Sequence, residues 1–401
     1  MIFIYFLLWR IFDFLIIFFS QKIIPYLGFF PYGDQLPGFN LPTWISSLAN
    51  FDGLHYVLIA KNGYSQFEQA FFPFYPLIIK FLTPLFSNNQ LLTGLIISNI
   101  SFLLGLILFY KYLKLILTDL TDSTDFIRFY PILSVLFLIA FPTSFFFGAV
   151  YTEGLFFLLL ILTLYFLKKE RYLLIFVSAF LASLTRLVGV FLVIPIIFHL
   201  MQKLKSKSQN LKSKLKSFLY SILIVSPLIG LATYCFYLYK TTGDPLFFLT
   251  SQPIFGANRS SHLILLPQVY WRYFKIFITA NWNFQYFTSL VEFIFFNFVF
   301  VILTLDLLKT INLRIKGLKN YELRITDYSR LGLNLFSFVN LILPTLTGTF
   351  SSIPRYALFS ISFFIYLSQI KNVFIKYLII GIFLILHILL LGYFSQGYFI
   401  S

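Results

Sequence analysis

Apolar runs of roughly membrane-spanning length recur along the whole chain. About 11 such runs are present, with approximate bounds 1–24, 90–117, 128–150, 154–168, 172–185, 187–201, 218–240, 284–308, 331–350, 355–369 and 376–394. A transmembrane helix needs about 20 apolar residues, within a range of about 17–25. Four runs (154–168, 172–185, 187–201 and 355–369) are short by this measure, so they would have to borrow flanking residues or tilt together.

The composition leaves one fold class. Of the 401 residues, 59% are hydrophobic and 11% are charged, whereas a soluble globular domain is about 25% charged. A chain with so little polar surface needs lipid around it, and within lipid the backbone polar groups must be satisfied inside the protein. We therefore expect a single all-α polytopic membrane domain over residues 1–401, with about 11 transmembrane helices. The first run has no small-residue cleavage site after it and is expected to be retained.

The basic residues indicate the topology of this domain. The net charge of +16 comes from short Lys- and Arg-containing runs between the apolar segments, and cytoplasmic loops of membrane proteins are enriched in these residues. With the N-terminus in the cytoplasm, the inner loops include 168–171, 203–217 and 309–330 and hold about 20 of the 30 basic residues. The charge therefore does not indicate nucleic acid as a partner.

The same topology places the two longest polar segments, 25–89 and 241–283, outside the cytoplasm. Loops of this length are usually functional or disordered, and these are rich in aromatic residues, Pro and Gly but poor in charge, which argues against disorder. We expect interfacial helices in the first of them and a functional site that faces outward from a bacterial plasma membrane.

Several common kinds of site are absent from the sequence. A single cysteine, Cys235, excludes an intrachain disulfide, and no CxxC or HExxH metal spacing occurs. No Walker A motif or Rossmann fingerprint is present either. We expect no resident cofactor or metal ligand set, although assistance by a divalent metal stays open.

Asp52 is the first candidate for chemistry. The outward carboxylates in this topology are Asp34, Asp52, Glu68, Glu153 and Asp244. Asp52 opens the segment DGLHYVLIA, whose apolar residues suggest a short amphipathic helix at the membrane interface. Asp52 would lie at its N-terminus, with His55 one turn later on the same side. The alternative is that Asp52 only caps this helix.

Glu153, Arg186 and Arg355 are the next candidates. Glu153 follows Thr152 at the outer end of a span, where it either contacts substrate or only complements the dipole of a helix that Thr152 caps. Arg186 and Arg355 lie at outer turns, against the positive-inside trend, so they either reach lipid phosphates or bind an anionic ligand. We favour the ligand for Arg355, because Pro354 fixes the helix start beside it.

The remaining charged and histidine residues have simpler interpretations. Arg10 and Asp13, three residues apart in the first span, are expected to pair with each other. His387 and also His199 are expected to be structural. Arg259 and His262, in the second outer loop, are possible substrate contacts.

The segment FDGLHYVLIAKNGY, followed by AFFPFYPL, resembles the PIG-V type mannosyltransferases. In that family a Trp-Asp pair, a His-Tyr pair and an Ala-x-x-Gly-Tyr precede a Phe-Phe-Pro-x-Tyr-Pro block, and Phe51 here replaces the usual Trp. The segments YTEGL, SLTRLVG, IPRYALF and SQGYFIS also resemble the family. The resemblance implies a GT-C fold, a catalytic Asp at Asp52 and substrate contacts at His55, Tyr56 and Tyr356.

The resemblance also implies the substrates. It predicts transfer of a sugar, mannose by analogy, from a polyprenyl-phosphate donor to a lipid, glycan or protein acceptor, with inversion and with Asp52 as general base. The alternative is a transporter or lipid-linked sugar flippase, which would carry charges in the middle of its spans and paired broken helices. A non-catalytic scaffold subunit would not need Asp52.

Overall fold

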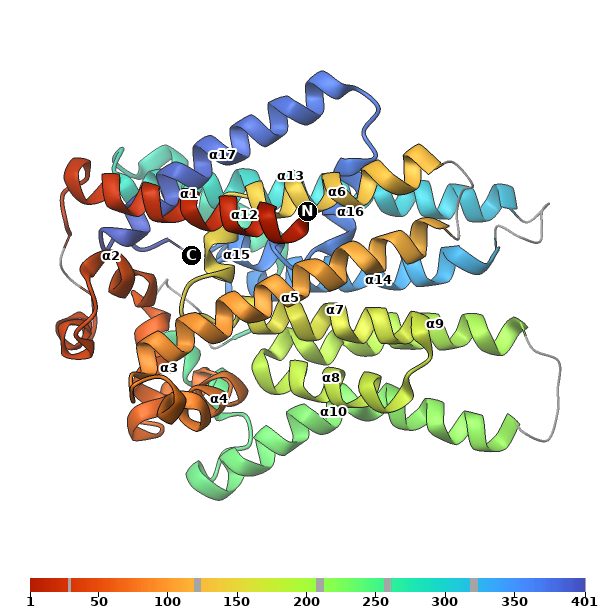
Figure 1. The fold of residues 1–401 in the computed structure, drawn as a ribbon, viewed down its shortest axis with the longest axis horizontal. Coiled ribbons are helices and arrows are strands. Elements are labelled where there is room, and N and C mark those ends of the chain that lie inside the picture. The colour runs from red at the N-terminus through yellow and green to blue at the C-terminus, as the bar shows by residue number, and fades with distance from the viewer. Residues whose placement is uncertain are drawn as a thin grey trace.

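The computed structural model describes residues 1–27, 30–118, 124–206, 213–255, 260, 262–317 and 324–400. Within these ranges every regular element is a helix, and the long helices lie side by side along the longest axis of the molecule (Figure 1). The all-α fold class is therefore confirmed.

Within the described residues, five helices are long and apolar enough to cross a bilayer. They are α1 (Ile2–Ile23), α5 (Gln90–Thr118), α10 (Ser213–Thr242), α13 (Phe284–Gly317) and α17 (Val373–Ser395). Each coincides with one of the apolar runs of the sequence, and together they identify the chain as an integral membrane protein.

The expected count of about 11 spans is not confirmed. The other six runs fall on helices that are shorter or interrupted: α6 (Thr124–Ala140), α7 (Glu153–Lys169), α8 (Tyr172–Thr185), α9 (Val193–Ser206), α14 (Arg324–Ile342), α15 (Ile353–Ala357) and α16 (Ile361–Ser368). Three of these runs contain 3-10 segments, namely η5 (Ser144–Phe147), η6 (Leu187–Leu192) and η9 (Leu343–Thr347). Continuous apolarity did not reveal these interruptions, because the residues in them are as apolar as those in the helices.

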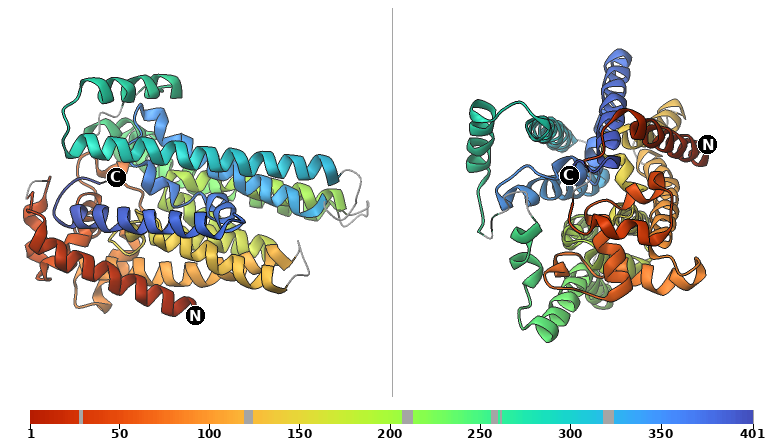
Figure 2. Two further views of the ribbon diagram at one scale, coloured as in Figure 1. Left: turned by 90° about the horizontal axis from the view of Figure 1, so that it is seen from above. Right: turned by 90° about the vertical axis from the view of Figure 1, so that its left-hand side faces the viewer.

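The two long polar segments form compact helical structure. The first contains η1 (Gly33–Phe39), α2 (Thr43–Ser46), η2 (Ser47–Ala49), α3 (Asp52–Asn62), η3 (Glu68–Ala70), α4 (Phe74–Leu82) and η4 (Thr83–Leu85). The second contains α11 (Phe247–Thr250), η7 (Gln252–Phe255) and α12 (Leu266–Thr279). In Figure 1, α2, α3 and α4 gather at the left-hand end of the bundle, and Figure 2 shows α12 beside α13 at the edge of the molecule.

The expectation that Asp52 opens an amphipathic interfacial helix is wrong. All eight residues from Gly53 to Ala60 are buried, so α3 has no apolar face to lay on lipid. Helix α4 fits that description better, because Tyr75 and Ile79 are buried while Leu77 and Phe81 are exposed. Protein packs around α3 on all sides, which fixes the position of its first residue.

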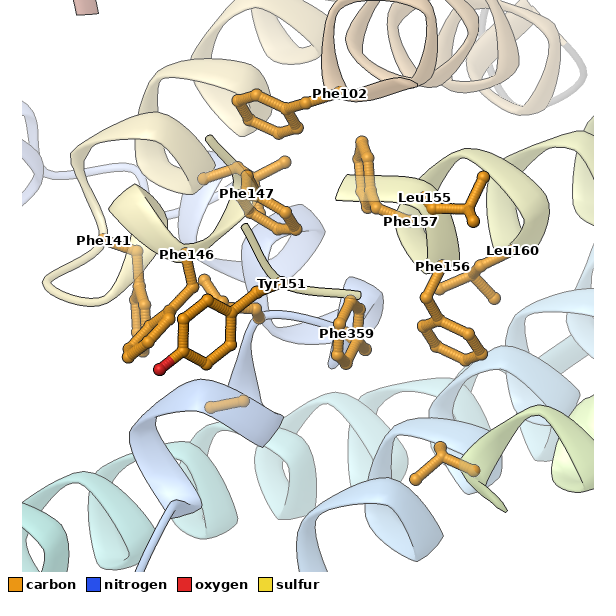
Figure 3. Packing of buried hydrophobic residues seen from close by; sticks show 14 of the residues in the cluster. Phe102, Phe141, Phe146, Phe147, Tyr151, Leu155, Phe156, Phe157, Leu160 and Phe359 are labelled. Atoms are coloured by element: carbon orange, nitrogen blue, oxygen red, sulfur yellow. The ribbon is translucent and has the colours of Figure 1, made fainter. Parts of the chain in front are cut away.

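An aromatic core fixes the start of α7. Phe102 of α5 stacks on Phe147 of η5, with 4.2 Å between ring centroids, and Figure 3 shows Phe157 of α7 beside them. At Gly154 a Cβ would lie 2.5 Å from the carbonyl oxygen of Ser98. Only glycine lets the start of α7 approach α5 this closely, and α7 begins at Glu153.

Candidate active site

A cleft of about 340 Å³ lies at the end of the bundle that carries α3. Among the described residues, three charged side chains line it: Asp52 at the start of α3, Arg186 directly after α8, and Arg355 in α15. Tyr56 and Tyr356 also line it. Five of the seven residues predicted to form the site therefore share one cavity, although they come from distant parts of the sequence.

Arg355 joins the two predicted carboxylates. Its Nη1 donates to Asp52 Oδ2 at 2.8 Å. Its Nε lies 3.1 Å from Glu153 Oε1, which is an ion-pair contact without the alignment of a hydrogen bond. Arg186 donates through Nη1 to the same Glu153 oxygen at 2.5 Å and to Thr152 Oγ1 at 2.9 Å. The order of contacts is thus Asp52, Arg355, Glu153, Arg186.

The two carboxylates differ in access to the cleft. The Asp52 side chain is 28% exposed and lines the cavity, whereas Glu153 is completely buried behind the arginines. Asp52 is therefore placed to meet a substrate, and Glu153 to hold the two guanidinium groups. Glu68, another carboxylate of the first polar segment, is buried as well.

The arginines remain charged in this environment. Burial alone would lower the pKa of Arg355, but the carboxylates of Asp52 and Glu153 raise it above its ordinary value. Burial is the largest single influence on Arg186 and would lower its pKa, but Glu153, together with Tyr356 and Tyr56, raises that pKa above its ordinary value. Two carboxylates and two guanidinium groups balance in formal charge, so the cluster can be buried without a net charge.

Aromatic rings surround both guanidinium groups. The Arg186 guanidinium lies 5.0 Å from the ring centroid of Tyr356, and that of Arg355 lies 5.4 Å from the ring of Tyr151. Cation–π contacts of this kind favour the charged form and restrict the side chains. Burial raises the pKa of Tyr56 well above its ordinary value, so its phenol stays neutral and can exchange hydrogen bonds with a substrate. Both arginine side chains are largely buried and paired with carboxylates, and their predicted contact with an anionic ligand stays a prediction.

The interpretation that Asp52 caps α3 is wrong. Phe51 occupies the N-cap position, no side-chain capping bond is formed there, and Asp52 is the first helical residue. Phe51 itself has a positive φ of 57°, which is strained for a bulky residue. A Cβ at Gly53 would lie 3.0 Å from the Val150 carbonyl oxygen. This tight turn directs the Asp52 carboxylate toward Arg355.

The expected cap of α7 is also absent. Thr152 holds the N-cap position but makes no side-chain capping bond to the backbone. Its hydroxyl instead accepts a hydrogen bond from Arg186. Glu153 is in the first turn, as a dipole contact requires, but its carboxylate is occupied by the two arginines.

His55 lies beside the cleft rather than in its wall. Its Nδ1 is 3.0 Å from Glu68 Oε1, and its ring stacks on Phe71, with 5.0 Å between centroids. Phe71 does line the cleft. His55 therefore supports the wall of the cavity, and its predicted contact with substrate stays a prediction.

Described residues of the second long polar segment, 241–283, line the far side of the cleft. Ser260 N–H donates to Thr347 O at 2.8 Å, which attaches this loop to η9. His262 lines the cavity there, and its predicted contact with substrate stays a prediction. Arg259 lies outside the described residues.

The sequence missed the residues that hold the cluster in place. Tyr151 donates from its hydroxyl to Asn50 O at 2.7 Å, which connects the segments preceding Glu153 and Asp52. The available signal was the position of Tyr151 in YTEGL, but its partner is 101 residues away in the chain.

In the part of the chain that the structure describes, no three His, Cys, Asp or Glu side chains gather as a metal site would require.

Fold and site together define an integral membrane protein with a charged cavity at one end of its helical bundle. A family model described as mannosyltransferase (PIG-V) matches residues 2–246, which is more than half of the chain. The chain belongs to the PIG-V mannosyltransferase family and is a membrane glycosyltransferase. The match includes Asp52, Glu153 and Arg186 but ends before Arg355. No curated protein and no solved structure matches the chain.

Proposed function

We propose that the protein transfers a sugar, mannose by family, from a polyprenyl-phosphate donor to a hydroxyl group of an extracytoplasmic lipid, glycan or protein acceptor, with inversion. The observation that carries this proposal is the contact between Asp52, which opens to the cleft, and the buried Arg355. This contact places a carboxylate that can act as a base beside a cation that can bind phosphate.

Asp52 acts as the general base in this proposal. An acceptor hydroxyl is a poor nucleophile, so a carboxylate must take its proton as the bond to the anomeric carbon forms. Direct displacement by the oxygen of the acceptor breaks the bond to the phosphate on the opposite face and inverts the anomeric centre. Glu153 is fully buried and Glu68 is engaged by His55, so neither competes for this role.

The arginines bind the leaving group. A polyprenyl phosphate departs as an anion, so it needs positive charge and no proton donor. An arginine that pairs with a carboxylate through one nitrogen can still donate to a phosphate oxygen through another, because guanidinium has five N–H donors. Arg355 and Arg186 both line the cleft and are both held by Glu153.

The remaining cleft residues would position the sugar. The neutral phenols of Tyr56 and Tyr356 can exchange hydrogen bonds with hydroxyl groups, and their rings give apolar faces. His55 would contribute here by holding Phe71, on which its ring stacks, in the wall of the cleft. A lipid-linked donor suits a cleft at the outer membrane surface, where no nucleotide sugar is available.

The test is transfer in vitro from a panel of radiolabelled polyprenyl-phosphate sugars. Asp52→Asn should lower the transfer rate by about 10²–10⁴-fold while leaving folding nearly unchanged. Asp52→Glu should also be poor, because the added methylene displaces the base. Asp34→Asn, an exposed carboxylate of the same loop outside the cleft, is the matched control and should keep wild-type activity.

Two results would overturn this assignment. Wild-type rates in Asp52→Asn, measured per folded molecule, would move the base elsewhere. Absence of transfer from every donor in the panel by the wild-type protein would reject the proposed donor class.

A further inference from the structure

Three ionisable side chains lie together inside the apolar bundle, away from the cleft wall. Asp13 of α1 is completely buried; its Oδ2 is 3.2 Å from Arg10 Nη1 and its Oδ1 is 2.8 Å from His387 Nε2 of α17. The predicted Arg10–Asp13 pair is thus confirmed, and His387 joins it. Ionisable residues inside membrane-spanning helices are costly, so such a cluster calls for a specific use.

Arg10 reaches beyond this cluster to the backbone of another element. Its Nη2 donates to the Gly148 carbonyl oxygen at 3.0 Å, and Asn99 Nδ2 donates to the same oxygen at 3.0 Å. A Cβ at Gly148 would lie 2.7 Å from Arg10 Nη1. Glycine is needed at this position because the guanidinium packs directly on the chain.

Gly148 begins the short segment 148–152, which is bound on several sides. Val150 N–H donates to Leu48 O at 3.0 Å, and Ser98 Oγ donates to Tyr151 O at 3.1 Å. The segment therefore takes its position from α1, α5 and η2 together.

The two carboxylates of the candidate active site, Asp52 and Glu153, both depend on segment 148–152. Glu153 follows it directly. Asp52 follows Asn50, whose carbonyl oxygen accepts the Tyr151 hydroxyl at 2.7 Å. The start of α3 also packs on the segment, because Gly53 leaves no room for a Cβ beside Val150 O. A shift of segment 148–152 would thus move the base and the anchor of the arginines at once.

We propose that Arg10, held by Asp13 and His387, is a positioning residue for the proposed transfer reaction. It fixes segment 148–152 and through it the separation of Asp52 and Glu153. The predicted effect of Arg10 on catalysis rests on the proposed function. Its predicted effect on the position of segment 148–152 does not.

Stability alone does not account for the cluster. A buried ion pair is a weak source of stability, since packed apolar side chains of similar volume often do as well. A guanidinium group that donates to one particular carbonyl oxygen fixes the position of that part of the backbone, which an apolar side chain cannot do. Asp13 and His387 restrict where that guanidinium points.

The experiment compares Asp13→Asn with Asp306→Asn. Asp306 is an equally buried carboxylate of α13 that pairs with Arg330 at 2.5 Å and does not line the cleft. Asp13→Asn should lower kcat by about 10- to 100-fold, since a misplacement of about 1 Å can cost about 100-fold. Asp306→Asn should lower the melting temperature about as much as Asp13→Asn does, while its kcat and KM stay near the wild-type values.

Amide hydrogen exchange supplies a readout that is independent of transfer. Asp13→Asn should speed exchange of the Val150 amide, which donates to Leu48 O, and Asp306→Asn should not. If the wild-type protein transfers no sugar, the proposed function fails, while this comparison still decides whether Arg10 holds the segment.

A double variant separates positioning from general damage. If Asp13 acts through the placement of Asp52, adding Asp13→Asn to Asp52→Asn should lower the residual rate by less than about 3-fold, because effects within one unit are not additive. If the two substitutions damage the protein independently, the fold-decreases in rate of the two single variants should multiply. Wild-type kcat together with unchanged Val150 exchange in Asp13→Asn would overturn the inference.

Discussion

Arg355→Gln removes the guanidinium group that contacts both Asp52 and Glu153 and leaves a shorter, uncharged polar side chain. If this group binds the phosphate of the donor, the variant should bind the donor more weakly. A hydrogen bond to a charged group contributes about 1.5–3 kcal/mol, and about 1.4 kcal/mol corresponds to a tenfold change in an equilibrium constant. We therefore expect the donor KM to rise by about 10- to 150-fold.

The cost in stability should be smaller than for most buried arginines. Breaking a buried ion pair by removing one partner typically costs about 3–5 kcal/mol, because the other charge is left unpaired. Here Glu153 keeps Arg186 at 2.5 Å, and the Asp52 side chain is 28% exposed and can turn to water. The protein should therefore fold, which makes the kinetic comparison interpretable.

Arg355→Lys gives a graded test. Lysine keeps the charge but presents a single ammonium group, so it cannot reproduce contacts from Nη1 to Asp52 and from Nε to Glu153. We expect donor KM to fall between that of wild type and that of Arg355→Gln. Arg171→Gln, an exposed arginine outside the cleft, serves as the control and should leave donor KM unchanged.

The assay is a donor titration at saturating acceptor, with thermal unfolding of the same preparations. An unchanged donor KM in Arg355→Gln would refute the reasoning and make Arg186 the next phosphate ligand to test. A fall in the maximal rate that matches the loss of folded protein, with donor KM unchanged, would assign Arg355 a purely structural role.

Three further predictions follow from burial, charge and topology. Glu153→Gln leaves two buried guanidinium groups short of a counter-charge and should cost about 3–5 kcal/mol in the free energy of unfolding, measured by denaturant titration; a loss below about 1 kcal/mol would show that the arginines rearrange. In a Cys235→Ser background, a cysteine at Ser65 should react with an impermeant thiol reagent on intact cells and one at Lys169 should not; the opposite pattern would invert the proposed orientation. Because burial raises the pKa of Tyr56, the folded protein keeps a proton that the unfolded chain loses above about pH 10, so stability should fall as pH rises past that value and fall less in Tyr56→Phe. Identical alkaline midpoints for the two proteins would contradict this.

The sequence predicted the membrane class well, because apolar length is a direct requirement of the bilayer. Helices α1, α5, α10, α13 and α17 match apolar runs closely. It also located helices in the remaining runs, but their number as membrane spans stays a prediction, because a short helix surrounded by other helices need not cross the bilayer by itself. Apolarity identifies burial but does not distinguish lipid from protein as the surrounding medium.

Helix α3 shows the same limit. Leu54, Val57, Leu58 and Ile59 suggested one apolar face, but His55 and Tyr56 on other faces are buried as well. The Nδ1 atom of His55 has a partner in Glu68, which lies 13 residues farther along the chain. Periodicity reports which face is apolar, and it cannot report that a polar face meets a matching polar partner.

The individual site residues were predictable, whereas their arrangement was not. Unusual charges at helix ends pointed to Asp52, Glu153, Arg186 and Arg355, each with a plausible local role. Their actual partners are non-local; Arg355 and Asp52 are 303 residues apart. Spacing within one helix suggests a cap or a dipole contact, and only the packed fold shows that the four side chains neutralise one another.

The contact between Arg355 and Asp52 couples donor binding to the base under the proposed function. A carboxylate paired with a guanidinium group holds its negative charge more tightly and is a weaker base than one without such a partner. When the phosphate of the donor enters, it competes with Asp52 for the donors of Arg355, while Glu153 keeps the arginine in place from behind. Asp52 then loses its contact with Arg355 only once the donor is present, and its carboxylate becomes a stronger base. Arg355→Gln should remove this coupling, so the donor titration should also show a higher ratio of donor hydrolysis to transfer than in the wild-type protein.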